Sequence, residues 1–381
     1  MPTNGFGTDQ VRAEYFRAGN PIFNDRKLKL GTFGANVKGG MAVSSGEGTL
    51  PGDWDSALEV VKLADEMEFE AMVPVGRFRG FGGETDYGGT AFEVYTFAAA
   101  VAMQTKYSAI FATSHVPTMN PVMAAKQAAT VDHVSKGRFV LNVVTGWHKT
   151  EMEMFGPAML DHDERYDVAA EWLEIIKQLW ERDDPLDYDG KYFQTRKALL
   201  KPRPLQRPRP PVMCAGQSGK GMHFAAKYCD IGFNSPKKTD SFEQMRANID
   251  AFKQLARDEY DRDLRMWSCV NIIQGETEKE AHRLHDYYVK EKGDFFAASN
   301  MANINTSYAE SDPQLRERLE DVVSGFGAYP LIGTAEQVAE GLQKFSSTGL
   351  DGIVLSWPDY HDGMKRFQEK TLPLLHQAGL R

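Results

Sequence analysis

The segment that decides the fold is YSAIFATSHVPTMNPVMAAKQAATVDHVSKGRFVLNVV, residues 107–144. It opens with a β-rich run at 107–113, continues with an amphipathic run at 121–135, and ends with a second β-rich run at 139–144. Pro121 suits a first helical turn, because the residue there needs no N–H partner. A strand, a helix and another strand in this order predict a parallel strand pair joined by a crossover helix.

The same alternation extends to both sides of this segment. Asp53 is placed to cap a helix that runs to about Glu68. Further helices are expected at about 92–103, 165–180, 219–228 and 241–256, from 277 and 334 onward, and at the end of the chain up to about 378. The strand candidates are 28–33, 71–75, 107–113, 139–144, 212–215, 231–234, 266–273 and 352–356.

Eight such βα units predict the α/β class and a (β/α)8 TIM barrel, as a single domain over residues 1–381. The rival architecture is an open doubly wound sheet. That fold would normally present a G-x-G-x-x-G turn after its first strand, and residues 34–40 lack this spacing.

Two segments depart from the alternation. Residues 181–210 end in crowded prolines, which favour extended or polyproline-like backbone, and we interpret them as a surface excursion. Residues 292–329 are polar and irregular. They are predicted to form a late insertion that acts as a mobile lid.

The composition excludes several classes of protein. Lys and Arg number 44 against 53 Asp and Glu, so the formal charge is −9, and this acidic excess disfavours a nucleic-acid partner. The chain has no apolar run of about 18 residues, and its start does not resemble a signal peptide. We therefore expect no membrane association and a cytoplasmic location.

The cysteines and histidines do not indicate a metal site. Three cysteines exclude a disulfide framework, none of them lies in a C-x-x-C pair, and the histidines form no H-E-x-x-H motif. No metal is expected.

In a TIM barrel the functional residues follow the carboxyl ends of the strands. The second strand is followed by Gly76 and Arg77, in a loop whose arginines and phenylalanines offer anion contacts and flat surfaces for a planar ring. An ordinary glycine-rich turn explains this loop equally well. Thr113 ends the third strand, and Asn142 lies near the end of the fourth, where a buried amide needs a hydrogen-bond partner.

Two helix starts could hold a phosphate group. Residues 214–221, CAGQSGKG, run from a strand into a helix but fail the Walker pattern, which leaves Ser218 at a helix N-terminus suited to an anion. Arg165 opens another helix within Glu164-Arg165-Tyr166. A salt bridge at the helix start accounts for this arginine as well as phosphate binding does.

Several of these segments, taken in order, resemble bacterial luciferase-like, reduced-FMN-dependent monooxygenases. They are residues 139–151 (FVLNVVTGWHKTE), 164–166 (ERY), 215–218 (AGQS) and 79–83 (RGFGG). Within that superfamily the chain is most similar to the pyrimidine (uracil) monooxygenases, with the dimethyl sulfone monooxygenases second.

The resemblance implies a TIM barrel, O2 as a reactant, and reduced FMN supplied by a separate NAD(P)H flavin reductase in a two-component system. By this resemblance Gly76 and Arg77 line the flavin, while Thr113 and Asn142 are the catalytic pair that faces its reactive ring edge and the oxygen. The remaining cofactor-binding residues that it implies are Glu151, Arg165, Tyr166 and Ser218.

The activity that the resemblance implies is oxygenation of a small polar substrate, such as a pyrimidine or cyclic amide, through a flavin peroxide. The matching Thr113 and Asn142 favour the N5-peroxide of the pyrimidine enzymes over the C4a-peroxide, which stays open. Two departures weaken the substrate assignment: Arg77 replaces the lysine of the pyrimidine enzymes, and residues 36–40 resemble the sulfone enzymes more closely. The alternatives are C–S cleavage of dimethyl sulfone or an alkanesulfonate, and flavin- or deazaflavin-dependent hydride transfer. We also expect a homo-oligomer.

Overall fold

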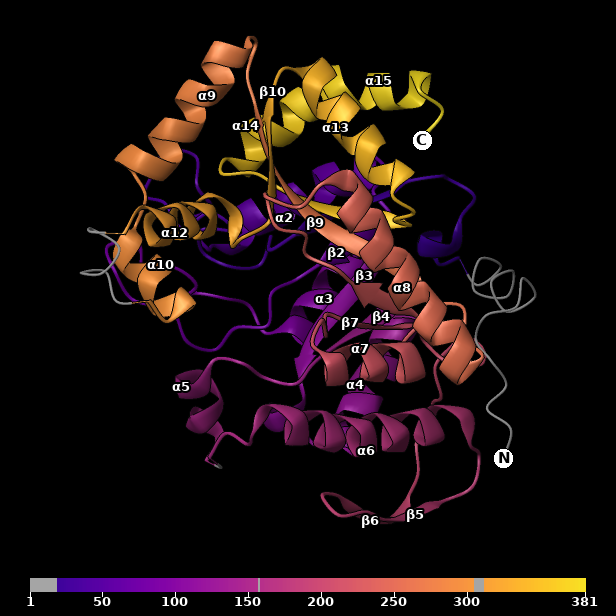
Figure 1. The fold of residues 1–381 in the computed structure, drawn as a ribbon. Coiled ribbons are helices and arrows are strands. Elements are labelled where there is room, and N and C mark those ends of the chain that lie inside the picture. The colour runs from indigo at the N-terminus through magenta and orange to yellow at the C-terminus, as the bar shows by residue number, and fades with distance from the viewer. Residues whose placement is uncertain (1–18, 157, 305–311) are drawn as a thin grey trace. The chain divides into compact units, whose positions relative to one another are not determined.

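The computed structural model describes residues 19–156, 158–304 and 312–381 (Figure 1). The strands match all eight predicted candidates, and the fold is the expected α/β TIM barrel. By contacts the chain divides into two compact units, which are described separately below. The single domain over 1–381 stays a prediction.

The first unit comprises the described part of Met1–Asn24, Glu93–Phe233 and Asp250–Met266, and we call it the β3–β8 unit. Its parallel strands pair in the order β3 (Ala109–His115), β4 (Phe139–Val144), β7 (Val212–Cys214) and β8 (Ile231–Phe233). Its helices are α3 (Val94–Ala102), α4 (Pro121–Val134), α5 (Lys149–Met152), α6 (His162–Glu181) and α7 (Gly219–Tyr228), with short 3-10 turns η1 (Pro21–Phe23), η2 (Val116–Thr118) and η3 (Glu153–Phe155).

The second unit comprises Asp25–Phe92, Asn234–Ile249 and Trp267–Arg381, and we call it the β1–β11 unit. Its parallel strands pair in the order β10 (Tyr329–Gly333), β9 (Arg265–Gln274), β11 (Gly352–Ser356), β1 (Lys29–Phe33) and β2 (Ala71–Val73), and the first two residues of β9 fall in the other unit. Its helical segments are α2 (Trp54–Glu66), α9 (Glu278–Asp286), η4 (Tyr287–Glu291), α10 (Phe295–Ala302), α12 (Pro313–Gly325), α13 (Ala335–Ser347), α14 (Tyr360–Arg366), η5 (Phe367–Thr371) and α15 (Leu372–Gln377). Helix α8 (Phe242–Tyr260) is divided between the two units.

Local sequence explains where the helices begin. Asp53 caps α2 as predicted, since its Oδ1 accepts the N–H of Ser56 at 2.9 Å. Pro121 occupies the first turn of α4, and Asn120 caps that helix. Helix α6 begins at His162, three residues before the predicted start, because the acidic residues Asp163 and Glu164 favour a helix N-terminus.

The structure corrects the interpretation of two segments. Residues 181–210 contain an antiparallel hairpin of β5 (Leu186–Asp189) and β6 (Gln194–Ala198), in addition to the extended proline-rich stretch. Within 292–329 the expected irregularity is wrong, because α10 and α12 are regular helices with aspartate caps and buried apolar faces. Asn305, Ser307 and Ser311 lie outside the described residues. The lid role of this insertion stays a prediction.

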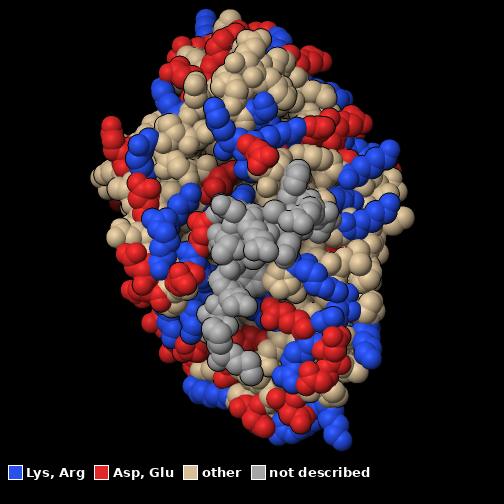
Figure 2. Space-filling model, turned by 90° about the vertical axis from the view of Figure 1, so that its right-hand side faces the viewer, with Lys and Arg blue, Asp and Glu red and all other residues tan. Residues whose placement is uncertain are grey.

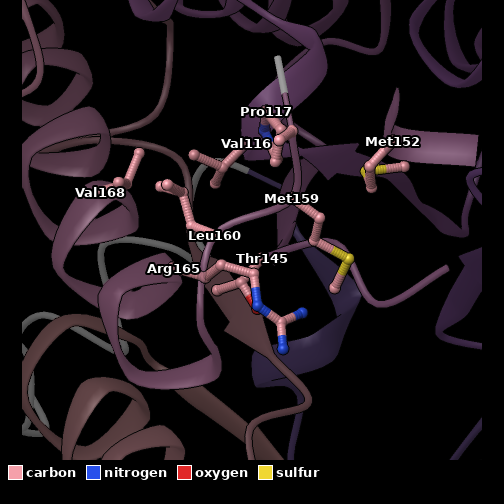
Figure 3. A pocket seen from close by; sticks show the side chains of 9 residues that line it. Val116, Pro117, Thr145, Met152, Met159, Leu160, Arg165 and Val168 are labelled. Atoms are coloured by element: carbon pink, nitrogen blue, oxygen red, sulfur yellow. The ribbon is translucent and has the colours of Figure 1, made fainter. Parts of the chain in front are cut away.

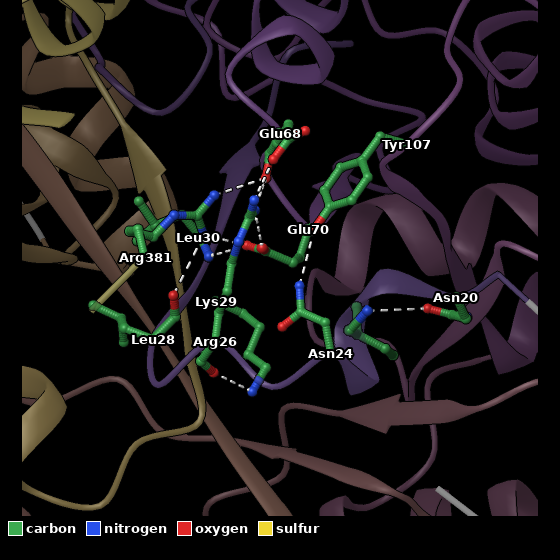
Figure 4. A network of polar contacts seen from close by, with 11 residues as sticks. Asn20, Asn24, Arg26, Leu28, Lys29, Leu30, Glu68, Glu70, Tyr107 and Arg381 are labelled. Atoms are coloured by element: carbon green, nitrogen blue, oxygen red, sulfur yellow. Dashed lines mark hydrogen bonds and ion pairs between the residues drawn. The ribbon is translucent and has the colours of Figure 1, made fainter. Parts of the chain in front are cut away.

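A buried carboxylate joins β1, β2 and the C-terminal residue at the amino ends of the strands (Figure 4). Glu70 accepts the N–H of Leu30 at 2.8 Å and a guanidinium N–H of Arg26 at 2.7 Å, and it also pairs with Arg381. In a TIM barrel this end carries stability and the opposite end carries function. We therefore assign this network to the stability of the barrel and look for functional residues at the opposite end of the strands.

On the face shown in Figure 2, blue and red side chains are interspersed, and the residues drawn there form no broad basic surface. None of the helices in the described part of the chain is long and apolar enough to cross a membrane. Among the described residues there is also no cluster of three or more His, Cys, Asp or Glu side chains arranged to bind a metal.

Candidate functional site

The structure joins the two predicted catalytic residues directly. Thr113 on β3 and Asn142 on β4 are register partners near the carboxyl ends of their strands. The Asn142 Nδ2 donates a hydrogen bond to the Thr113 Oγ1 at 3.0 Å, and both residues are buried. The parallel pairing of β3 and β4 is what places these side chains next to each other.

The other end of the Asn142 amide has no hydrogen-bond partner among the described residues. Its Oδ1 is buried and accepts no hydrogen bond within the described part of the chain. Leaving a buried acceptor unsatisfied costs roughly 1–3 kcal/mol. An acceptor at the carboxyl end of a barrel strand that carries this cost is suited to receive a hydrogen bond from a ligand.

A second cluster forms where β7 leads into α7. Ser218 caps α7, because its Oγ accepts the N–H of Gly221 at 3.1 Å. The phenol of Tyr166 is hydrogen-bonded to the side chains of Ser218 and Thr145, and burial raises the pKa of Tyr166 above its usual value. The phenol is therefore neutral at pH 7. The hydroxyls of Tyr166 and Ser218 form a pair at the N-terminus of α7.

Glycine is required at this turn. A Cβ on Gly221 would lie 2.7 Å from the Tyr166 hydroxyl, and one on Gly216 would lie 2.8 Å from the Gly221 Cα. The turn thus comes close to Tyr166 only because these positions carry no side chain. The result is a narrow cradle of backbone N–H groups and hydroxyls.

Arg165 lies beside this cluster on α6. Its guanidinium donates to the carbonyl of Gly146, its Nε has no partner within the described residues, and burial lowers the pKa of Arg165. The group stays cationic, because the pKa of an arginine lies far above neutral pH. Glu151, the remaining predicted residue of this unit, is fully buried on α5.

A cavity of about 160 Å³ opens next to Arg165 (Figure 3). Arg165 and Thr145 provide its polar groups, and the rest of its lining is apolar: Val116, Pro117, Met152, Ala158, Met159, Leu160 and Val168. Sequence reasoning missed both the cavity and Thr145. Thr145 had a signal, since it directly follows β4, three residues after Asn142.

Gly76 and Arg77 lie in the β1–β11 unit, where they follow β2. Arg77 is buried, and its guanidinium carbon lies 4.9 Å from the centroid of the Phe81 ring. Arg77 thus occupies one face of the Phe81 ring, and the flavin contacts of Gly76 and Arg77 stay a prediction. The structure therefore brings six of the predicted residues into one unit and places the other two in the second.

Comparison with known proteins assigns the family. The luciferase-like monooxygenase family matches residues 29–352. The chain belongs to this family. Pyrimidine monooxygenase RutA of Serratia proteamaculans is 29% identical over 354 residues, which cover 91% of this chain and 95% of that protein.

Solved structures agree with the fold. The long-chain alkane monooxygenase LadA superposes with a TM-score of 0.81 at 22% identity, over 93% of this chain and 92% of that one. Riboflavin lyase RcaE, solved with modified FMN and riboflavin, gives a TM-score of 0.80 at 18% identity, over 93% and 92% of the two chains. The luciferase-like chain is a flavin-dependent monooxygenase, and its cofactor is a reduced flavin.

The residues present fit a phosphorylated flavin. The N-terminus of α7, the hydroxyls of Ser218 and Tyr166 and the nearby cation of Arg165 form a donor set suited to a phosphate dianion. The unsatisfied Asn142 Oδ1 offers an acceptor to an N–H group of a ring system. Both features lie in the β3–β8 unit.

Proposed function

We propose that this luciferase-like enzyme uses reduced FMN and O2 to oxygenate a small polar substrate such as a pyrimidine or cyclic amide. A separate NAD(P)H flavin reductase supplies the reduced FMN, so the system has two components. The observation that carries the proposal is the buried Thr113–Asn142 pair with its unsatisfied amide oxygen. A homo-oligomer and a cytoplasmic location stay predictions.

The phosphate end of the site favours FMN over riboflavin. Ser218, Tyr166 and Arg165 hold the phosphate in this proposal, with Glu151 completing the cofactor site. Charge-assisted hydrogen bonds to a dianion are roughly twice as strong as neutral ones. These residues therefore give the phosphate a large share of the cofactor affinity.

The reactive end is formed by Thr113 and Asn142, with Gly76 and Arg77 as further flavin contacts. When bound, reduced FMN supplies the electrons that activate O2. The Thr113 hydroxyl and the Asn142 amide are already held against each other by a hydrogen bond, and in this proposal they orient the oxygen and the reacting edge of the ring. The insertion at 292–329 acts as the lid that excludes water.

The pyrimidine assignment is supported by the identity to the pyrimidine monooxygenase of Serratia proteamaculans. Cleavage of dimethyl sulfone or a short alkanesulfonate is the alternative, because the loop at 36–40 and Arg77 depart from the pyrimidine pattern.

The decisive experiment supplies the purified chain with FMN, NADH and a generic flavin reductase, and measures O2 uptake together with product. Uracil, dimethyl sulfone and short alkanesulfonates are compared, and the reductase alone is the control. Oxygenated product from uracil supports the proposal, and product from the sulfur compounds alone moves the assignment to C–S cleavage. Substrate turnover that continues when O2 is removed from the assay would indicate hydride transfer and overturn it.

A further inference from the structure

The cap of helix α10 also contacts a distant loop. Asp294 precedes α10, and its Oδ1 accepts the N–H of Ala297 at 2.9 Å. Its Oδ2 accepts the backbone N–H of Thr85 at 2.8 Å and the Thr85 hydroxyl at 2.9 Å. Thr85 lies in the loop that follows β2 and carries Arg77. One buried carboxylate thus joins the late insertion to the predicted flavin loop within the β1–β11 unit.

Two further contacts fix the same loop to α10. The Asn300 Nδ2 donates to the carbonyl of Phe81 at 2.8 Å. Gly83 allows Asp294 to approach, because a Cβ there would lie 2.3 Å from the carboxylate and the backbone has a φ of +80°. Phe81 also packs in a buried apolar cluster with Ala297 and other α10 residues.

These contacts reach Arg77 through Phe81. The Arg77 guanidinium lies over the Phe81 ring, and that ring stacks on Tyr87 with centroids 6.2 Å apart. The Tyr87 hydroxyl donates to the carbonyl of Gly40 at 3.0 Å. The aromatic surface against which Arg77 rests is therefore held on one side by α10 and on the other by the loop after β1.

We propose that Asp294 is a positioning residue for the flavin site: it holds the loop at 76–85 so that Arg77 is in place before the cofactor binds. This inference rests on the proposed FMN site. It gives α10 a role in positioning as well as the predicted role in a lid. Asp294 and Asn300 hold Thr85 and Phe81, and Phe81 in turn contacts Arg77, so the position of α10 affects the position of Arg77.

The chain offers a matched control for this role. Asp312 caps α12 in the same insertion, where its Oδ1 accepts the N–H groups of Gln314 and Leu315. Within the described residues, the Asp312 side chain accepts hydrogen bonds only from these first residues of α12. Asp294 and Asp312 are therefore alike as caps, and they differ in the bond to the loop.

The test compares Asp294→Asn with Asp312→Asn. Asparagine keeps one oxygen for the helix cap but presents an NH2 group to the backbone N–H of Thr85, so that bond breaks while α10 stays capped. The Thr85 hydroxyl can turn to accept from the new NH2 group, so the variant tests the backbone contact. Two quantities are measured: hydrogen exchange of amides 78–86 in flavin-free protein, and the FMN dissociation constant by fluorescence. Since a hydrogen bond to a charged group contributes about 1.5–3 kcal/mol, Asp294→Asn should raise both the exchange rate and the dissociation constant about tenfold or more. Asp312→Asn should change each by less than about twofold.

Thr85→Val serves as a second variant, because it removes the hydroxyl contact alone and should give a smaller effect of the same sign. Unchanged exchange in Asp294→Asn would overturn the proposal. Faster exchange with unchanged FMN affinity would overturn it too, since the loop would be held without positioning Arg77. If the unaltered protein binds no FMN, the proposed function itself fails, and the positioning role fails with it.

Discussion

Replacing Asn142 by alanine separates a catalytic role from a structural one. The two polar atoms of the side chain differ: Nδ2 donates to Thr113, whereas Oδ1 is buried and accepts no hydrogen bond from residues 19–156, 158–304 or 312–381. Alanine removes both ends. The structure therefore predicts a large loss of catalysis without a matching loss of stability.

The stability effect follows from two opposed contributions. The lost hydrogen bond to Thr113 destabilises by about 0.5–1.5 kcal/mol, while removing a buried unsatisfied oxygen relieves roughly 1–3 kcal/mol. The sum lies between about 0.5 kcal/mol of destabilisation and about 2.5 kcal/mol of stabilisation, so the free energy of unfolding of the flavin-free protein should not fall by more than about 1 kcal/mol. A preorganised side-chain donor or acceptor at a reacting centre is worth about 2.7–4 kcal/mol, so product formation should fall about a hundredfold to a thousandfold.

The assay has two parts. Urea unfolding of flavin-free protein gives the stability, and the ratio of oxygenated product to hydrogen peroxide gives the coupling of electrons to oxygenation. In Asn142→Ala the reduced flavin is still oxidised, but its electrons should appear mainly as hydrogen peroxide. FMN affinity should fall less than turnover, because the phosphate contacts at Ser218 are unchanged.

Asn271 on β9 is the matched control. It is also a fully buried strand asparagine, but its Nδ2 donates to the carbonyl of Ser324 at 2.9 Å and its Oδ1 accepts the Ser356 hydroxyl at 3.1 Å. Asn271→Ala should therefore destabilise by roughly 2–4 kcal/mol, because two buried groups lose their partners. If Asn142→Ala behaves like this control, with lost stability and an unchanged product-to-peroxide ratio, the oxygen-handling role is refuted.

Two further variants test the proposed phosphate-binding residue Ser218 and the buried ion pairs of Asp230. Ser218→Ala should weaken FMN binding about tenfold and leave riboflavin binding nearly unchanged, measured by fluorescence titration, and equal losses for both ligands would refute the phosphate assignment. Burial would raise the pKa of Asp230, but its ion pairs with Arg209 and Arg262 outweigh burial and hold that pKa below its usual value. The stability from this group should be complete above the unfolded pKa of about 3.9 and be lost as the pH falls through the lower folded pKa; Asp230→Ala should cost about 3–5 kcal/mol in urea unfolding at pH 7 and abolish this acid-dependent loss.

The sequence alone was sufficient for the barrel, because the alternation of β-rich and amphipathic runs is a local property. Asp53 and Pro121 marked helix starts that the structure confirms, since caps depend on a few neighbouring residues. The sequence alone did not predict the helices within 292–329. The asparagines there suggested irregularity, but α10 and α12 are stabilised by apolar contacts with distant loops that no local pattern records.

The candidate site divides in the same way. The sequence determined which residue types lie at the carboxyl ends of the strands and at the helix starts, so it placed Thr113, Asn142 and Ser218 there, and the resemblance gave them their roles. Only the tertiary structure decided which of their atoms are in contact. The Asn142 Nδ2 donates to Thr113, while its Oδ1 has no partner among the described residues. The Tyr166 hydroxyl is hydrogen-bonded to Ser218, beside a turn that contains glycines. The bond from Asp294 to Thr85 is a still stronger case, because the two residues are 209 positions apart. Contacts at such separations are set by strand register and helix packing, which act over the whole chain at once.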